Sequence, residues 1–268
     1  MPVFDERDLV AALQPIKPYL GDLVLCGGWT LLIYRRWVVM DGGPLPMATM
    51  DLDLAVSRRL DVVSRPVNEL LREAGFRENY IGMDEPTITY VKEGAPEIEF
   101  LTPRSGNRPA HPVEVQRGLK ADPLRFIEVI LESTRTVTLR GMELRIRVPT
   151  PEAYLYQKGL SFPRRRDDAK KAKDLAYLFE LLHNFPSLRE DLPTKLGALR
   201  RRHPRGWFTT FKDNLNAFIP ASGGEGVGMV ADQRPHPFDA MLVRDPTNGP
   251  GLFKELVRGA FRTFLEQI

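Results

Sequence analysis

The chain has 268 residues, of which 43% are hydrophobic and 27% are charged, and its formal net charge is +3. This composition excludes a disordered chain and allows a substantial core in one large domain or two small ones. The single cysteine excludes an internal disulfide framework, and no Cys and His cluster has zinc-ligand spacing. The apolar stretches are shorter than the roughly 20 residues of a membrane-spanning helix, and no secretory signal pattern is evident. We therefore expect a soluble, cytoplasmic protein with no membrane partner.

The first half predicts strands mixed with helices. Helical spacing and period-two alternation mark the elements. We expect helices over residues 5–19, 29–40 and 67–74; strands over 23–26, 50–56, 134–139 and 144–148; a hairpin of 87–91 with 97–101; and an irregular crossing segment over 104–123.

After Pro149 the pattern becomes helical. The predicted helices cover residues 151–159, 167–182, 188–202, 207–218 and 253–268, and a long loop or partly disordered connection is expected near 220–251. We interpret the chain as an α+β protein with two domains. Residues 1–148 would form a small mixed sheet with flanking helices, and residues 149–268 a mainly helical lobe.

Two aspartates mark the strand over residues 50–56. Asp51 and Asp53 alternate with leucines, so they share one face of the strand. Like charges held that close are costly unless a cation lies between them. Mg²⁺ or Mn²⁺ with oxygen ligands suits such a pair. Glu99 on the strand over 97–101 is the better third carboxylate, and Glu97, on the same face, is a competitor that the sequence leaves open.

The pair Gly27-Gly28 stands between a predicted strand and a predicted helix. Glycines at such a turn let backbone N–H groups approach a phosphate, and the helix dipole favours negative charge there. Thr30 could add a hydroxyl. The alternative is an ordinary tight turn, and the acidic strand about twenty residues later favours the phosphate site.

These motifs together resemble a known superfamily. Gly27-Gly28-Trp29-Thr30-Leu31, then Thr49-Met50-Asp51-Leu52-Asp53-Leu54, then Ile98-Glu99-Phe100-Leu101 resemble the polymerase-beta-type nucleotidyltransferases. The resemblance implies that the glycine turn grips a nucleoside triphosphate and that Asp51, Asp53 and Glu99 bind two metal ions. It also implies transfer of a nucleoside monophosphate to a hydroxyl of an RNA, a protein or a small molecule.

A second resemblance lies downstream. Pro149-Thr150-Pro151-Glu152-Ala153 with Lys158, and Arg166 with Lys173-Asp174-Leu175, are similar to the abortive-infection toxin branch of that superfamily. It implies catalytic roles for Lys158 and Asp174, nucleotide contacts from Lys158 and Lys173, and an antitoxin protein as partner. Tyr177 stands where that branch often has an aspartate. The alternative for Lys173 and Asp174 is a solvated helix face.

Two basic clusters suggest a further partner. Arg164-Arg165-Arg166 with Lys170-Lys171, and Arg200-Arg201-Arg202 with His203 and Arg205, could hold an RNA backbone, tRNA included. Runs of arginine are more often solvated faces. Two other functions stay open at this point: a catalytically weak nucleotide-binding or interaction module on the same fold, and a regulatory protein that binds nucleic acid.

Overall fold

The computed structural model describes residues 6–39, 43–47, 49–81, 87–106, 111–140, 142–220, 224–233 and 247–268. The chain divides into two compact units. The sheet unit comprises Met1–Ile33 and Ala48–Thr150, and the helical unit comprises Tyr34–Met47 and Pro151–Ile268. Residues 34–47 thus group with the helical unit, whereas the sequence placed them in a domain spanning 1–148.

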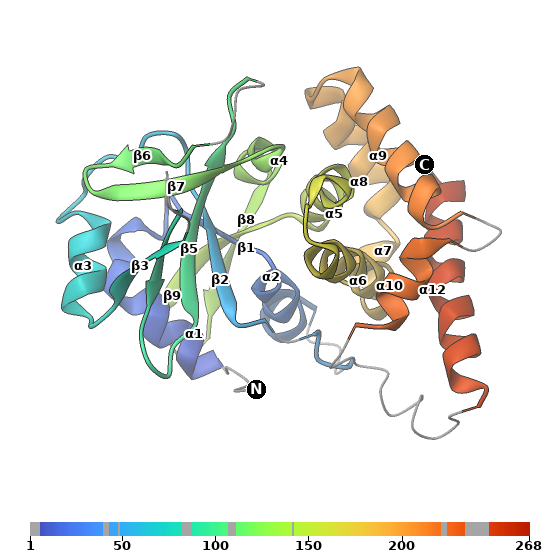
Figure 1. Ribbon diagram of the computed structural model, residues 1–268, viewed down its shortest axis with the longest axis horizontal. Helices are drawn as coiled ribbons and strands as arrows, with labels where there is room; N and C mark the ends of the chain where they lie inside the picture. Colours follow the sequence, from blue (N-terminus) through green and yellow to red (C-terminus); the bar gives the residue numbers. More distant parts are fainter. Residues whose placement is uncertain are drawn as a thin grey trace. The chain divides into compact units, whose positions relative to one another are not determined.

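The sheet unit is built on one mixed sheet (Figure 1). Its strands are β1 (Val24–Cys26), β2 (Asp51–Ala55), β3 (Arg77–Ile81), β4 (Thr87–Val91), β5 (Glu97–Pro103), β6 (Val113–Gln116), β7 (Leu119–Leu124), β8 (Thr134–Leu139) and β9 (Leu144–Pro149). They follow the order β3-β4-β5-β2-β1-β9-β8, and β7 pairs with both β5 and β6. The predicted α+β fold, with a mixed sheet followed by a mainly helical part, is confirmed.

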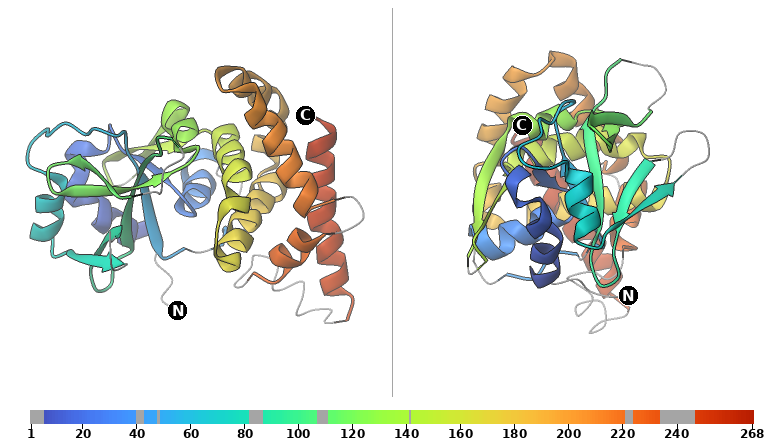
Figure 2. Two further views of the ribbon diagram at one scale, coloured as in Figure 1. Left: turned by 45° about the horizontal axis from the view of Figure 1, so that its top comes forward. Right: turned by 90° about the vertical axis from the view of Figure 1, so that its left-hand side faces the viewer.

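The helices of the sheet unit are short. They are α1 (Glu6–Leu13), the 3₁₀ helix η1 (Gln14–Tyr19), α2 (Trp29–Ile33), α3 (Val67–Glu73) and α4 (Ile127–Glu132). Helix α3 lies beside η1 (Figure 2). The Tyr19 hydroxyl at the end of η1 holds the loop before α3, because it donates to the Arg65 carbonyl at 2.7 Å and accepts from the Val63 N–H at 3.1 Å.

One face of the central strands forms the core of the sheet unit. Leu54 pairs with Leu25 of β1 and with Phe100 of β5, and Leu52 pairs with Ile98. All five side chains are at most 2% exposed. Burying a Leu, Ile or Phe side chain contributes roughly 1.5–3 kcal/mol. Because the strand period is two, the residues between these apolar positions must all face the other way.

Several elements of the first half differ from the sequence prediction. Residues 104–123 were expected to be irregular but contain β6 and most of β7, which form an antiparallel hairpin around Gly118 at φ +75°. Buried Val115, Leu119 and Ala121 explain these strands. The strand β3 and the helix α4 were not predicted. The hairpin of β4 with β5 and the strands β8 and β9 are confirmed.

Two predicted helices change character along their length. The expected helix over residues 5–19 becomes 3₁₀ after Leu13, where Pro15 and Pro18 remove backbone donors. The expected helix over 29–40 is α-helical only to Ile33 and continues as the π-helix η2 (Tyr34–Val39). Met40 lies outside the described residues. Short π-helical segments are frequent at functional sites.

The helical unit contains seven α-helices and two 3₁₀ turns among its described residues, besides η2. They are α5 (Pro151–Ser161), η3 (Phe162–Arg164), α6 (Asp168–Asn184), α7 (Pro186–Arg189), α8 (Leu192–Leu199), η4 (Arg200–Arg202), α9 (Arg205–Phe218), α10 (Glu225–Ala231) and α12 (Gly249–Glu266). The predicted apolar stripe of α6, comprising Ala172, Leu175, Ala176 and Phe179, is buried.

Two predictions for this unit were wrong in detail. One helix was expected over 188–202, but the chain forms separate short helices there: Pro186 is the first residue of α7, and Pro193 is the second residue of α8. The connection near 220–251 contains the helix α10, whose Val227 and Val230 are buried. Residues 221–223 and 234–246 of that connection lie outside the described residues. No helix in the described part of the chain is long and apolar enough to cross a membrane.

Candidate active site

The acidic strand β2 carries the first two candidate residues. Leu52 and Leu54 point into the core, so Asp51 and Asp53 share the opposite face. Asp51 is exposed and Asp53 is half-buried. The alternation of acidic and apolar residues therefore places both carboxylates where a ligand from solvent can reach that face.

The parallel pairing of β2 with β5 brings two more carboxylates beside them. Asp51 is the partner of Glu97, and Asp53 is the partner of Glu99. Neighbouring strands lie about 4.8 Å apart, so each aspartate stands beside a glutamate on the same face. Both glutamates are half-buried. Both glutamates therefore remain candidates for the third carboxylate, and they differ in their position along β5. Glu97 is level with Asp51, and Glu99 is level with Asp53.

The turn after β1 is built around Asp53. Cys26 is the antiparallel partner of Asp53, so the next residue, Gly27, reaches the level of the carboxylate. A Cβ on Gly27 would lie 1.8 Å from Asp53 Oδ2. Gly27 also has φ +71°, a conformation that side chains other than glycine rarely adopt. Sterics and backbone conformation both require glycine at this position. They bring the turn against the face of β2 and β5 that carries Asp51, Asp53, Glu97 and Glu99, which we call the acidic face.

The helix α2 begins directly after Gly28. Thr30 donates its backbone N–H to the Gly27 carbonyl at 3.3 Å, and its hydroxyl donates to the Leu25 carbonyl at 3.5 Å. The Thr30 side chain is fully buried. It therefore ties the start of α2 to β1 in this structure, and the predicted hydroxyl contact with a phosphate would require that bond to break.

The donor set of the acidic face suits a hard cation. No group of three or more His, Cys, Asp or Glu side chains is arranged to hold a metal ion within the described ranges. Mg²⁺, however, usually takes one or two carboxylates and fills its other positions with waters and substrate phosphates. Asp51, Asp53, Glu97 and Glu99 supply only oxygen ligands, so their chemistry fits Mg²⁺ or Mn²⁺.

The candidate residues of the helical unit form a buried ionic cluster. The Lys158 ammonium and the Asp174 Oδ1 form an ion pair, and Arg165 Nε donates to Asp174 Oδ2 at 2.9 Å. Lys158 and Asp174 are 7% and 3% exposed. Burial raises the pKa of the Asp174 carboxyl, but the charges and hydrogen bonds of Lys158 and Arg165 outweigh burial and lower that pKa. Asp174 is therefore no solvated helix-face residue.

Aromatic rings surround the same cluster. Lys158 Nζ lies 5.5 Å from the centre of the Tyr177 ring and 5.9 Å from that of Tyr154. Lys173, one turn before Tyr177, is half-buried, and its Nζ lies 6.0 Å from the same Tyr177 ring. A tyrosine thus occupies the position where the toxin branch often has an aspartate, and it contributes cation–π contacts.

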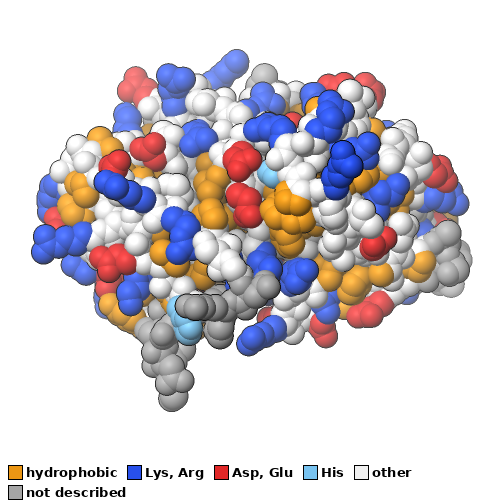
Figure 3. Space-filling model, turned by 90° about the horizontal axis from the view of Figure 1, so that it is seen from above, with side chains coloured by type: hydrophobic (Ala, Val, Ile, Leu, Met, Phe, Trp, Pro, Cys, Tyr) orange, Lys and Arg blue, Asp and Glu red, His pale blue; other side chains and the backbone are white. Residues whose placement is uncertain are grey.

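The basic clusters divide into buried and exposed members. Arg165 is committed to Asp174, whereas Arg164, Arg166 and Lys170 are exposed, as are Arg200, Arg201, Arg202 and Arg205. On the face drawn in Figure 3, Lys and Arg side chains are scattered over the surface, and Asp and Glu side chains lie among them. Surface charge alone therefore does not mark a nucleic-acid site.

Two polar residues escaped the sequence prediction. Asp122 on β7 pairs with Leu101 and so lies on the acidic face, where it accepts from the Thr87 hydroxyl at 2.7 Å. It was missed because residues 104–123 were read as irregular. Glu180, 1% exposed on α6, accepts from the Met47 N–H at 3.0 and 3.2 Å. The sequence feature that could have indicated Glu180 is the position of a glutamate among the apolar residues of a predicted helix.

Residues 6–196 match a protein family described as "Nucleotidyltransferase". Among solved structures, the chain is similar to an antigenic nucleotidyltransferase-like protein from Paracoccidioides brasiliensis, with 18% identity, a TM-score of 0.40, and coverage of 79% of this chain and 95% of that one. None of the curated proteins matches.

Proposed function

The chain belongs to the nucleotidyltransferase family, and on that premise we propose that it transfers a nucleoside monophosphate from a nucleoside triphosphate to a hydroxyl acceptor, with a divalent metal ion. The observation that carries this proposal is the register of β2 with β5. It places Asp53 beside Glu99, while Asp53 Oδ2 occupies the space that a Cβ on Gly27 would fill. Carboxylates and a glycine turn thus meet at one place.

Each part of this region has a distinct role in the proposal. Asp51, Asp53 and Glu99 would ligate Mg²⁺ or Mn²⁺ together with phosphate oxygens, and the metal would neutralise charge on the phosphates and activate the attacking hydroxyl. Gly27 and Gly28 would hold the β- and γ-phosphates through their backbone N–H groups, to which glycine adds no side chain of its own. Glu99, level with Asp53, also orients the acceptor hydroxyl.

The helical unit supplies cations in the proposal. Lys173 is half-buried, whereas Lys158 is buried, so Lys173 is the more accessible of the two lysines. The Lys158 ammonium is also already paired with Asp174. In the proposal Asp174 orients Lys158 through the ion pair that these two residues form. We propose Lys158 and Lys173 as triphosphate contacts of the helical unit.

The acceptor and the biological role follow from the resemblance to the abortive-infection toxins. We propose RNA, tRNA included, as the acceptor and an antitoxin protein as the partner that restrains the enzyme. In this proposal the exposed arginines of η4 contact the RNA backbone. Induced expression in a host cell should arrest growth for the wild type and not for Asp51→Asn/Asp53→Asn.

The first experiment is a calorimetric titration of ATP, CTP, GTP and UTP, each with Mg²⁺ and with EDTA. We expect one or more triphosphates to bind only with Mg²⁺, and Asp51→Asn/Asp53→Asn to lose that binding. Asp61→Asn is the matched control, because Asp61 is an exposed acid paired with Arg59. Equal binding with and without Mg²⁺, or unchanged binding by the double variant, would refute the metal-dependent proposal. Metal-dependent binding without any transfer would favour a nucleotide-binding module.

A further inference from the structure

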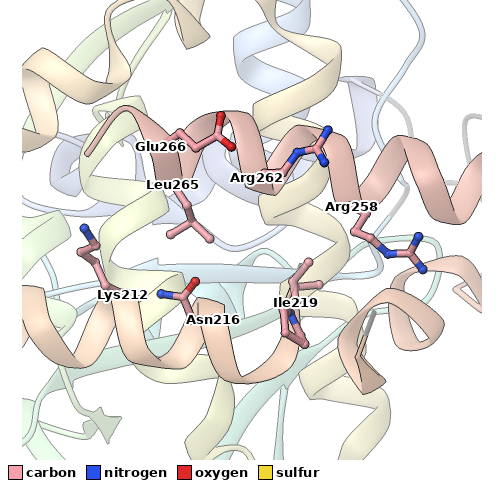
Figure 4. A pocket seen from close by; sticks show the side chains of 8 residues that line it. Lys212, Asn216, Ile219, Arg258, Arg262, Leu265 and Glu266 are labelled. Carbon is pink, nitrogen blue, oxygen red and sulfur yellow. The ribbon is translucent and has the colours of Figure 1, made fainter. Parts of the chain in front are cut away.

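A cleft of about 250 Å³ lies between α9 and α12 of the helical unit (Figure 4). Three cations line it: Lys212 from α9, and Arg258 and Arg262 from α12. Asn216 adds an amide and Glu266 a single carboxylate. The charged groups of this α9/α12 cleft are therefore positive on balance, which favours an anionic ligand.

Arg258 gives the cleft an unused donor. One end of its guanidinium pairs with Glu255 of the same helix. Its Nε–H is buried and has no hydrogen-bond acceptor within the part of the chain that the structure describes. A buried donor without an acceptor costs free energy. The exposed part of the same guanidinium is its fork of terminal N–H groups, which matches phosphate geometry.

The cations are spaced along the cleft rather than gathered at one point. Arg258 and Arg262 are four residues apart on α12, so their Cβ atoms are about 5–6 Å apart on one side of that helix. Lys212 and Asn216 have the same spacing on α9. Lys212 Nζ also donates to the Ile268 carbonyl at 3.2 Å, which holds it between the two helices. Such a row suits an extended chain of phosphates better than one small anion.

An aromatic ring connects the cleft with the exposed arginines of η4. Lys212 Nζ lies 5.9 Å from the centre of the Phe208 ring, and Arg200 Cζ lies 4.3 Å from the same ring. Phe208 is half-buried and Arg200 is exposed. Cations along a groove with an aromatic ring beside them are typical of surfaces that bind single-stranded nucleic acids.

We propose that the α9/α12 cleft binds the phosphodiester backbone of a nucleic-acid strand, with Arg258, Arg262 and Lys212 as the phosphate contacts. As the binding site of an acceptor strand, the cleft rests on the proposed function. As a nucleic-acid site it does not, since binding is measured without nucleotide or metal and in the Asp51→Asn/Asp53→Asn background.

The test is fluorescence anisotropy with a labelled 12-nucleotide single-stranded RNA, and with the DNA of the same sequence, over a range of salt concentrations. Arg258→Gln/Arg262→Gln should raise the Kd roughly tenfold or more, as expected for two lost charged hydrogen bonds. It should also lower the slope of log Kd against log salt concentration by about 1.4, because each phosphate contact on a single strand contributes about 0.7. The matched control is Lys195→Gln/Lys254→Gln, which removes two exposed charges of the helical unit outside the cleft.

Two further variants and a competing anion complete the test. Arg258→Lys/Arg262→Lys keeps the charge and should retain most of the salt slope, and Lys212→Gln tests the other wall if the arginine variant unfolds. The same Kd and slope for the cleft variants and the control pair would overturn the proposal. Displacement of the RNA by an equal concentration of inorganic pyrophosphate would also overturn it, because the cleft would then be a site for free phosphate groups.

Discussion

The acidic face of the sheet unit and the ionic cluster around Asp174 in the helical unit differ in which charges lie next to each other. On the sheet unit, Asp51 and Asp53 stand beside Glu97 and Glu99, so carboxylates neighbour carboxylates on one face. In the helical unit, each oxygen of Asp174 meets a cation, Lys158 or Arg165. The first arrangement gains from an added cation, whereas the second is complete within the fold. Removing a charge should therefore have different consequences for stability in the two regions.

The largest effect is expected for Asp174→Asn. This change leaves Lys158 buried with a charge that no longer has its carboxylate, and breaking a buried pair costs about 3–5 kcal/mol. Urea unfolding should show a loss of that size. Asp168→Asn is the control, because Asp168 forms a surface pair with Lys171. Equal losses in the two variants would show that burial of the Asp174 pair contributes nothing.

Gly27→Ala should follow. Its Cβ would lie 1.8 Å from Asp53 Oδ2, and φ +71° disfavours any side chain. We expect a loss of about 2–4 kcal/mol in unfolding free energy, together with loss of metal-dependent triphosphate binding. Gly94→Ala separates the two causes, since Gly94 has φ +73° but open space around the missing Cβ. A Gly27→Ala variant no less stable than Gly94→Ala would contradict the close approach of Asp53.

The sequence predicted the acidic face well because the relevant pattern is local. Asp51 and Asp53 alternate with leucines, and Glu97 and Glu99 alternate with Ile98 and Phe100, so period two alone assigns each face. The pairing of β2 with β5 required only that the two faces match. Local patterns of this kind survive in the fold because a slip of one residue would bury the acids.

Other features depend on contacts between distant residues, which the sequence could not supply. The strands β6 and β7 were missed because Pro112 and Pro123 dominate a polar stretch, although Val115 and Leu119 are buried. The ionic cluster was predicted only in part. The sequence marked Lys158 and Asp174, but nothing in it indicated that Arg165 would take the second oxygen of Asp174. Glu180 was missed because its partner, the Met47 N–H, lies 133 residues away.

Glu180 should make stability depend on pH. Burial raises the pKa of the Glu180 carboxyl to about 8, against the lowering effects of the Met47 hydrogen bond and the Arg35 charge. Because the folded-state pKa lies above the unfolded value, this carboxyl contributes stability below the unfolded pKa, and that stability is lost as pH rises toward 8. The free energy of unfolding of Glu180→Gln should therefore exceed that of the wild type by roughly 1–3 kcal/mol at pH 8.

Urea unfolding from pH 5 to 8.5 measures this difference. The wild type should lose stability across the range relative to Glu180→Gln, because only the wild type must ionise a buried carboxyl. Glu190→Gln is the control, since Glu190 is exposed. Parallel pH profiles for the wild type and Glu180→Gln would contradict the raised pKa.

The smallest effect is expected on the acidic face, and its dependence on Mg²⁺ is the informative part. Like charges on neighbouring strands destabilise a sheet by about 0.2–1 kcal/mol, and a cation bound beside Asp53 would offset that cost. Added Mg²⁺ should then stabilise the wild type and leave the variant Asp53→Asn unchanged, because a ligand stabilises only the protein that binds it. Equal stabilisation of the wild type and of Asp53→Asn by Mg²⁺ would mean that no cation binds beside this carboxylate. The contrast with Asp174 would then disappear, and with it the reason to place a cation beside Asp53.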